Sequence, residues 1–131
     1  MISTKGRYAL RLMIDLAEHE TDNYIPLKDI AERQGISKKY LEIIVKDLVS
    51  AGLISGISGK GGGYKLCKEE YSVGEILEAT EGPLAPVACL AINADTCDKE
   101  KECRTLPLWR EYDTLVHDFF FNKKLTELTR K

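Results

Sequence analysis

Residues 26–52 read PLKDIAERQGISKKYLEIIVKDLVSAG. Pro26 suits the first turn of a short helix, and Gln34-Gly35-Ile36 is too short to be anything but a tight turn. Ser37 then caps a longer helix, for which Gly52 is a natural C-terminal stop. Both segments carry an apolar face at helical spacing. The two faces consist of Leu27, Ile30 and Ala31, and of Leu41, Ile44, Val45 and Leu48. A short helix, a glycine-containing turn and a longer helix in this order predict a helix-turn-helix unit.

The flanking segments extend this unit at both ends. Residues 4–20 carry apolar side chains at helical spacing and predict a first helix, with Thr4 as its N-cap. Its apolar stripe consists of Ala9, Leu12, Met13, Leu16 and Ala17. Two β-prone runs, 53–57 and 64–67, flank a glycine-rich tip and predict a hairpin in the position of a wing. A phosphate-binding loop is a weaker interpretation of these glycines, because a β-prone run and not a helix follows them.

The C-terminal half predicts a further short helix and then a long one. Ser72 and Glu75 form a capping box that begins the short helix, and Pro107 opens the long one. Four apolar residues of the long helix fall at i, i+4, i+7 and i+11, namely Leu108, Tyr112, Leu115 and Phe119. This narrow seam is typical of helix pairing, so we expect a homodimer; packing of the helix back onto its own domain is the alternative.

The predicted fold is therefore mainly α with a small β-hairpin wing. It divides into a winged helix-turn-helix domain at residues 1–82, a cysteine-containing loop at residues 83–105, and a dimerisation helix with a C-terminal tail at residues 106–131. We expect the first part to bind DNA and the loop to act as a sensor. The alternative is a DNA-binding regulator of the same fold without a cofactor, which uses a thiol switch or binds a protein partner through its acidic C-terminal half.

The composition fits one small globular protein. The chain has 131 residues, of which 44% are hydrophobic and 31% are charged, and this excludes a collagenous or wholly disordered protein. No apolar run is long enough to span a membrane, and the first residues lack the apolar centre of a signal peptide. We therefore expect a cytoplasmic protein with reduced cysteines.

The net charge of −2 is distributed unevenly along the chain. Residues 1–66 carry ten Lys and Arg against eight Asp and Glu, whereas residues 67–131 carry nine against thirteen. A mildly basic front half fits contact with a polyanion.

The second helix of a helix-turn-helix unit places its N-terminal residues in the major groove of double-stranded DNA. That helix would span residues 37–51, and its candidates are Ser37, Lys38, Lys39, Tyr40 and Glu42. The lysines suit phosphates or guanine edges, the tyrosine suits a phosphate, and the glutamate can accept from a cytosine amino group. The further candidate cations are Lys5, Arg7, Lys60 and Lys65. Lys60 is the best placed of these, because the glycines around it allow close approach to a narrow groove. An ordinary solvated surface is the alternative for each side chain.

Three cysteines, Cys89, Cys97 and Cys103, share one short polar segment with the spacing C-x7-C-x5-C. Three converging thiolates suggest a metal or iron–sulfur centre, while inert thiols, a structural zinc and a dithiol redox switch stay open. Cys67 stands apart, and we interpret it as a small packing residue. An enzyme is not expected, because no nucleophile–base set is visible and both histidines fall on helices far from the cysteines.

Several stretches together carry a family resemblance. They are residues 3–10 (STKGRYAL), 30–37 (IAERQGIS), 40–42 (YLE), 61–66 (GGGYKL), 73–76 (VGEI), 81–84 (EGPL) and 107–109 (PLW), with the three cysteines. On these motifs, in this order over nearly the whole chain, the sequence resembles the Rrf-two (Rrf2) family of bacterial winged helix-turn-helix regulators.

The resemblance implies a homodimer that binds a roughly palindromic operator, with the C-terminal helices crossing between subunits. It also implies that Glu42 reads bases, as the equivalent glutamate does in some members. The three loop cysteines would ligate an iron–sulfur cluster, as in the cluster-binding members.

Three positions depart from the family pattern. Leu106 stands where one cluster-binding member has a histidine ligand, and Arg7 stands at or near a carboxylate ligand of another. At the wing tip, Ser58-Gly59-Lys60 replaces an arginine-proline pattern. The fourth cluster ligand is therefore not identified; the nearby oxygen donors are Asp95, Asp98, Glu100 and Glu102.

Overall fold

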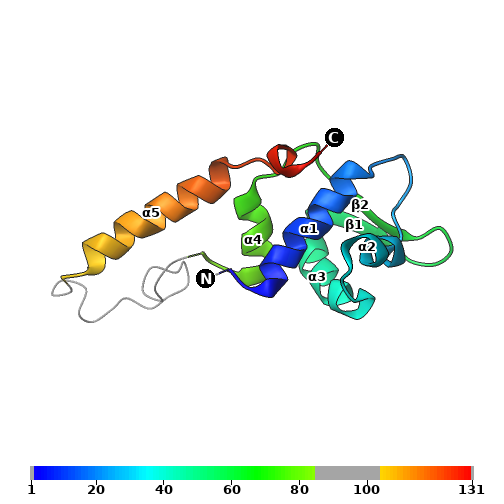
Figure 1. Cartoon of the computed structure of the whole chain (residues 1–131), viewed down its shortest axis with the longest axis horizontal. Helices are drawn as coiled ribbons and strands as arrows, with labels where there is room; N and C mark the ends of the chain where they lie inside the picture. The colour runs from blue at the N-terminus through cyan, green and yellow to red at the C-terminus, as the bar shows by residue number, and fades with distance from the viewer. Residues whose placement is uncertain (1, 85–103, 131) are drawn as a thin grey trace.

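The computed structural model describes residues 2–84 and 104–130 and confirms a mainly helical chain with one β-hairpin (Figure 1). The elements are α1 (Thr4–Glu18), α2 (Leu27–Gln34), α3 (Lys38–Ser50), β1 (Ile54–Ile57), β2 (Gly63–Leu66), α4 (Val73–Glu81), α5 (Leu106–Asn122) and the 3-10 helix η2 (Leu125–Leu128). The expected helix-turn-helix therefore consists of α2 and α3. None of the described helices is both long and apolar enough to cross a membrane.

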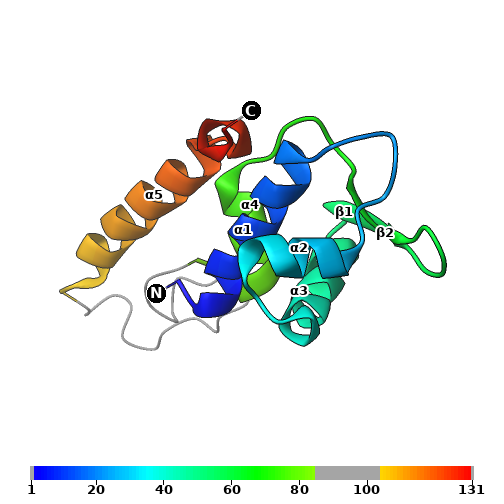
Figure 2. The same ribbon diagram turned by 45° about the vertical axis from the view of Figure 1, so that its right-hand side comes forward.

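Helices α1, α2, α3 and α4 lie against one another in two views of the ribbon (Figures 1 and 2). The buried core residues come from all four of these helices, and Leu53, Ile54, Tyr71 and Leu125 join them. The whole predicted stripe of α3 is buried, and so is that of α1 except for the half-buried Ala17. Burial of a Leu or Ile side chain stabilises a fold by about 1.5–3 kcal/mol. Because short helices are marginal on their own, this packing is what holds the helix-turn-helix together.

The predicted signals at the helix-turn-helix and at α4 are confirmed. The Oγ of Ser37 accepts a hydrogen bond from the N–H of Tyr40 at 3.1 Å, and Gly35 ends α2 with φ at +65°. At α4 the capping box is complete. The Oγ of Ser72 accepts from the N–H of Glu75 at 3.1 Å, and the Glu75 carboxylate accepts from the N–H of Ser72 at 2.8 Å.

The prediction of Thr4 as the N-cap of α1 is wrong by one residue. Ser3 is the cap, and its Oγ accepts from the N–H of Gly6 at 3.3 Å. Thr4 already belongs to the helix, whereas the backbone of Ser3 is extended. The carboxylate of Glu81, at the end of α4, accepts hydrogen bonds from the N–H and the hydroxyl of Ser3 and holds this residue in place. Periodicity along α1 alone could not reveal this long-range contact.

The two strands form the predicted antiparallel hairpin, and a neighbouring loop supports it. Their pairing runs from Ile54 opposite Leu66 to Ile57 opposite Gly63. Ile25, just before α2, pairs with Tyr64 of β2 through two backbone hydrogen bonds of 2.9 Å. A Cβ at Gly63 would lie 2.2 Å from the carbonyl oxygen of Ile25, so only glycine permits this close approach.

A buried carboxylate ties α1 to the C-terminal end of α2. Asp15 is fully buried and accepts hydrogen bonds from Arg33 Nη2 at 2.7 Å, Arg33 Nε at 3.1 Å and Gln34 Nε2 at 2.9 Å. The hydrogen bond to Asp15 raises the already high pKa of Arg33, so the interaction favours the charged guanidinium. Arg33 and Gln34 directly precede the turn of the helix-turn-helix, so this contact fixes where the turn lies.

The long helix α5 runs outward from the rest of the fold (Figure 1). Its C-terminal end packs on α4, where the ring of Phe121 lies over Gly74; a Cβ at Gly74 would come within 2.3 Å of that ring. The ring of His117 stacks on Phe121 with centroids 4.3 Å apart.

Residues 123–130, which we call the C-terminal strap, return to the helical domain after α5. The N–H of Val73 donates to the carbonyl of Lys123 at 2.8 Å, and the N–H of Leu125 donates to the carbonyl of Tyr71 at 2.9 Å. Leu125 itself is buried in the core. The strap therefore anchors the end of α5 to the segment that leads into α4.

We expect Asp15→Asn to lower the free energy of unfolding by about 2 kcal/mol. The substitution replaces a buried, charged acceptor with a neutral amide, and so weakens the hydrogen bonds that Arg33 and Gln34 donate. Urea unfolding followed by circular dichroism measures this change. The matched control is Asp22→Asn, an exposed position expected to stay within about 0.5 kcal/mol of the parent chain. An Asp15→Asn chain of unchanged stability would contradict the role of this contact.

Candidate nucleic-acid interface

The N-terminal turn of α3 lies at the surface, opposite the buried stripe of the same helix. Ser37, Lys38, Lys39 and Glu42 are exposed. Tyr40 is half-buried, because its ring meets that of Tyr8 of α1 edge to face with centroids 5.7 Å apart. The predicted residues of this helix are thus brought together on one outward turn.

A groove open to solvent runs between the outer face of α3 and the hairpin. It is lined by Glu42, Val45, Lys46, Val49 and Ser50 of α3, and by Gly56, Ile57, Ser58 and Tyr64 of the hairpin. Lys46 is not among the residues predicted from the sequence, although it stands one helical turn after Glu42 and the i, i+4 spacing could have identified it. The groove therefore combines a cation, a carboxylate, hydroxyls and apolar surface.

The four further candidate cations are not equivalent. Lys60 is exposed at the wing tip, between Gly59 and Gly61, both of which have positive φ. Lys5 forms an ion pair with Asp47 of α3. Lys65 donates to the carbonyl of Asp22 at 3.2 Å.

Arg7 is exposed and donates to the hydroxyl of Thr4 at 3.3 Å. Within residues 2–84 and 104–130, Lys38, Lys39 and Lys60 form no ion pair, so their charges are available to a partner.

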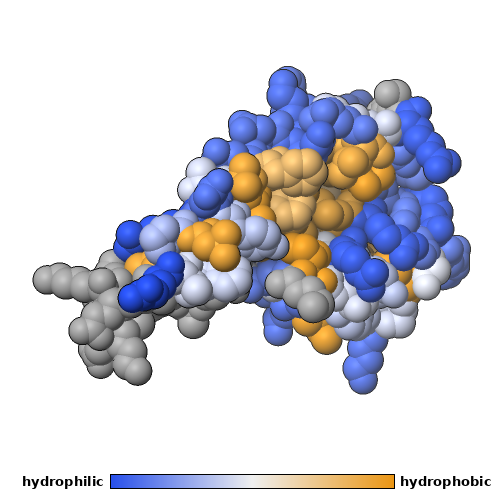
Figure 3. Space-filling view, turned by 60° about the vertical axis from the view of Figure 1, so that its left-hand side comes forward, coloured by the Kyte–Doolittle hydropathy of each residue, from blue (hydrophilic) through white to orange (hydrophobic). Residues whose placement is uncertain are grey.

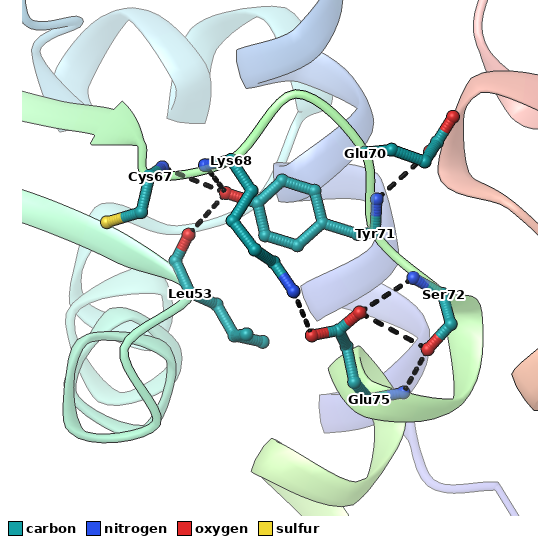
Figure 4. A network of polar contacts seen from close by, with 7 residues as sticks. All are labelled: Leu53, Cys67, Lys68, Glu70, Tyr71, Ser72 and Glu75. Carbon is teal, nitrogen blue, oxygen red and sulfur yellow. Dashed lines mark hydrogen bonds and ion pairs between the residues drawn. The ribbon is translucent and has the colours of Figure 1, made fainter.

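A polar network centred on Tyr71 holds the two roots of the wing, which we define as Leu53 before β1 and Cys67-Lys68 after β2 (Figure 4). The buried Tyr71 hydroxyl donates to the carbonyl of Leu53 at 2.6 Å and accepts from the N–H groups of Cys67 and Lys68, each at 2.9 Å. Burial raises the pKa of Tyr71, so the hydroxyl keeps the proton that it donates.

The carboxylate of Glu75, at the start of α4, contacts the side chain of Lys68 and the cap residue Ser72 (Figure 4). Burial would raise the pKa of Glu75, but hydrogen bonds from Lys68 and Ser72 outweigh burial and lower it. Glu75 is therefore charged when it accepts from the Lys68 ammonium.

The predicted seam of α5 is exposed along its length. The exposed fractions are 57% for Leu108, 50% for Tyr112, 63% for Leu115 and 59% for Phe119. Apolar side chains gather in a broad patch on the face of the molecule seen in Figure 3. The described structure thus does not pack this seam back onto its own domain.

The cysteines fall into two groups. Cys89, Cys97 and Cys103 lie outside the described residues, and so do the four acidic oxygen donors near them. Cys67 is exposed, so its interpretation as a packing residue is wrong; it directly follows the last paired residue of β2, where the strand ends. In the part of the chain that the structure describes, no three His, Cys, Asp or Glu side chains could together hold a metal ion.

Comparisons with known proteins agree on one family. The family model of Rrf2, described as an iron-dependent transcriptional regulator, matches residues 2–131. The HTH-type transcriptional regulator IscR of Vibrio cholerae is 39% identical over 129 residues, which cover 97% of this chain and 73% of that protein.

Two solved structures confirm the winged helix-turn-helix fold. CymR (YrzC), the global cysteine regulator of B. subtilis, matches with a TM-score of 0.79 at 35% identity over 98% of this chain and 95% of that one. The oxidized form of Staphylococcus aureus CymR matches with a TM-score of 0.75 at 36% identity over 100% of this chain and 97% of that one. The chain belongs to the Rrf2 family of transcriptional regulators.

Proposed function

We propose that this regulator binds double-stranded DNA through α3 and the wing, as a homodimer, and senses its signal through the loop that holds Cys89, Cys97 and Cys103. The observation that carries the DNA-binding proposal is the exposed face of α3. In a helix-turn-helix protein, the first turns of the second helix enter the major groove of DNA. Here those turns carry unpaired cations and Glu42, and the hairpin forms the other side of the protein's own groove next to them.

Some of these side chains are suited to contacts with phosphates, which position the protein on DNA, and others to contacts with bases, which specify the sequence. Ser37, Lys38, Lys39, Tyr40 and Arg7 suit phosphate contacts, with the lysines also able to reach guanine edges. Glu42 suits a cytosine amino group, Lys60 suits the minor groove, and Lys46 is a further phosphate candidate in the groove. Lys5 and Lys65 already contact Asp47 and the loop before α2, so we assign them mainly to holding α1 and the wing in place.

A second copy of the chain is the proposed partner of α5. Four large apolar side chains at coiled-coil spacing are half or more exposed, and such a continuous apolar face is typical of a protein interface. Pairing through α5 would present two copies of α3 to one duplex. The half-sites of the operator would then lie about one helical turn apart, or multiples of it.

The loop cysteines are the proposed sensor. Three thiolates are the ligand type that iron–sulfur clusters take, and the matching family model is described as iron-dependent. Leu106, buried at the start of α5, supplies no ligand, so the fourth ligand comes from elsewhere. When bound, a cluster supplies one-electron redox chemistry. The loop precedes α5, so a change in its conformation that favours one placement of α5 would change operator affinity.

A thiol switch without a cofactor is the second candidate for the loop. It is favoured by the match to CymR, a protein solved in an oxidized form, and by the leucine at position 106. DNA binding by α3 and the wing is common to both candidates.

To test DNA binding, a duplex selected from a random-sequence pool is titrated at several salt concentrations. Lys38→Ala and Lys39→Ala are each expected to weaken binding and to reduce the slope of log affinity against log salt by about one. Glu42→Ala should relax the preference for particular base pairs instead. Lys124→Ala, an exposed change in the C-terminal strap, is the control and should leave the slope unchanged. Absence of binding, or a flat salt dependence, would refute the DNA-binding proposal.

To test dimerisation, sedimentation equilibrium is run on Leu115→Glu. The variant is expected to be monomeric and folded, because Leu115 lies in the exposed seam and burying a charge against a second copy is unfavourable. Thr114→Glu adds the same charge at an exposed position outside the seam and should stay dimeric. A parent chain that is monomeric, or a Leu115→Glu chain that is still dimeric, would show that α5 is not the interface.

To test the sensor, the protein is purified without oxygen and analysed for iron, labile sulfide and visible absorption. Serine at Cys89, Cys97 or Cys103 should abolish all three signals, and Cys67→Ser should leave them intact. A parent chain that stays colourless and iron-free after reconstitution would remove the cluster. Mass spectrometry of alkylated thiols before and after oxidation would then test the thiol switch.

A further inference from the structure

We infer that Tyr71 is a positioning residue for DNA binding: its hydroxyl clamps the two roots of the wing and so sets where the wing lies relative to α3. The inference rests on the proposed DNA-binding function for its role, but the clamp itself is a property of the fold. Tyr71 has no place among the predicted contact residues, because it lies in the core and cannot touch DNA.

The hairpin requires such a support. A two-stranded sheet is marginal on its own, and the strand pairing here ends at Ile54 opposite Leu66. One residue further, the direct backbone hydrogen bond from Cys67 to Leu53 stretches to 3.4 Å. The ladder therefore loosens at the point where the wing joins the domain.

At that point the Tyr71 hydroxyl forms hydrogen bonds to both roots of the wing. It reaches the carbonyl of Leu53 on one root at 2.6 Å, and the N–H groups of Cys67 and Lys68 on the other root at 2.9 Å (Figure 4). A tyrosine hydroxyl has one proton to donate and two lone pairs, so these contacts use its full capacity. A single buried oxygen thus joins the two chain segments just beyond the paired part of the hairpin, where their direct backbone contact is long.

The clamp is also fixed relative to α3. Leu53 follows the last turn of that helix, where its N–H donates to the carbonyl of Leu48 at 3.0 Å. The backbone of Tyr71 is held from the other side, where its carbonyl accepts from Leu125 of the C-terminal strap. The hydroxyl therefore links the end of α3 to the wing, which are the two walls of the proposed DNA groove.

Hydrogen exchange followed by NMR tests the clamp in the unmodified chain. The amides of Cys67 and Lys68 lie beyond the strand ladder, yet we expect them to be protected to the same degree as those of β2. Exchange at the rate of an open loop would overturn the clamp without recourse to any variant.

Tyr71→Phe isolates the hydroxyl, because it keeps the buried ring. We expect the amides of the hairpin and its roots to exchange about three- to tenfold faster, relative to those of α1 and α3, which is the effect of losing a hydrogen bond of ordinary strength. Tyr24→Phe, whose ring lies beneath the Lys65 ammonium, is the matched control and should change neither group. Equal acceleration of all amides would mean a structural role only and would overturn the inference.

A double-variant cycle with Lys60→Ala tests the link to DNA. If Tyr71 positions the wing, the fold-loss in affinity caused by Lys60→Ala should be clearly smaller in the Tyr71→Phe chain than in the parent. An equal loss in both chains would overturn the positioning role. If the parent binds no duplex at all, the proposed function fails, and the exchange measurements still decide whether the clamp exists.

Discussion

The burial of one face of α3 is the constraint on which the interface depends. Leu41, Ile44 and Leu48 are fully buried, so the helix cannot turn about its axis without exposing them. A shift by one residue would rotate the helix by about 100° and move Glu42 toward the core. The core therefore determines which side chains of α3 face outward, and the same packing that stabilises the domain orients its candidate reading residues.

Orientation about its own axis does not yet place α3 relative to the rest of the domain. Asp15 fixes the end of α2, and with it the turn that leads into α3. The ion pair of Lys5 with Asp47 adds a direct contact between α1 and α3, although a partly exposed pair of this kind contributes only about 0–1 kcal/mol. The main contribution thus comes from the buried carboxylate, and the surface pair refines the position.

Local signals in the sequence predicted the elements well, and contacts between distant residues explain what they missed. Helical spacing identified the buried faces of α1 and α3, and the caps Ser37 and Ser72 set two helix starts. The partners of Asp15 and Tyr71 lie up to 54 residues away in the chain, at Leu125, and no local pattern encodes them. The error at Thr4 has the same origin, because Glu81 favours the neighbouring Ser3.

The residues of the candidate site also fall into two groups, those that the local sequence predicted and those whose contacts only the tertiary structure shows. The outward turn of α3 followed from its buried face, whereas the engagement of Lys5 and Lys65 with other parts of the domain required the tertiary structure. The sequence assigns the same charge to every lysine. Under the proposed function, the lysines without an internal hydrogen-bond or ion-pair partner are the ones available to the phosphates of DNA. Helical spacing from Glu42 could have placed Lys46 on the same face of α3, but only the tertiary structure shows that the hairpin lies opposite it.

Glu42 accounts for how a chain with a net charge of −2 can serve as a selective DNA-binding protein under the proposed function. A carboxylate at the centre of a surface that approaches phosphates opposes contact with every duplex, and so weakens the sequence-independent part of binding. Where a cytosine amino group lies opposite, the carboxylate gains a hydrogen bond that offsets this repulsion. Specificity is a difference between affinities, so a group that penalises wrong sequences raises it even when it lowers affinity overall. Under the proposed function, a few unpaired lysines around Glu42 would then be enough, because strong attraction to every sequence would hide the preference that Glu42 would create.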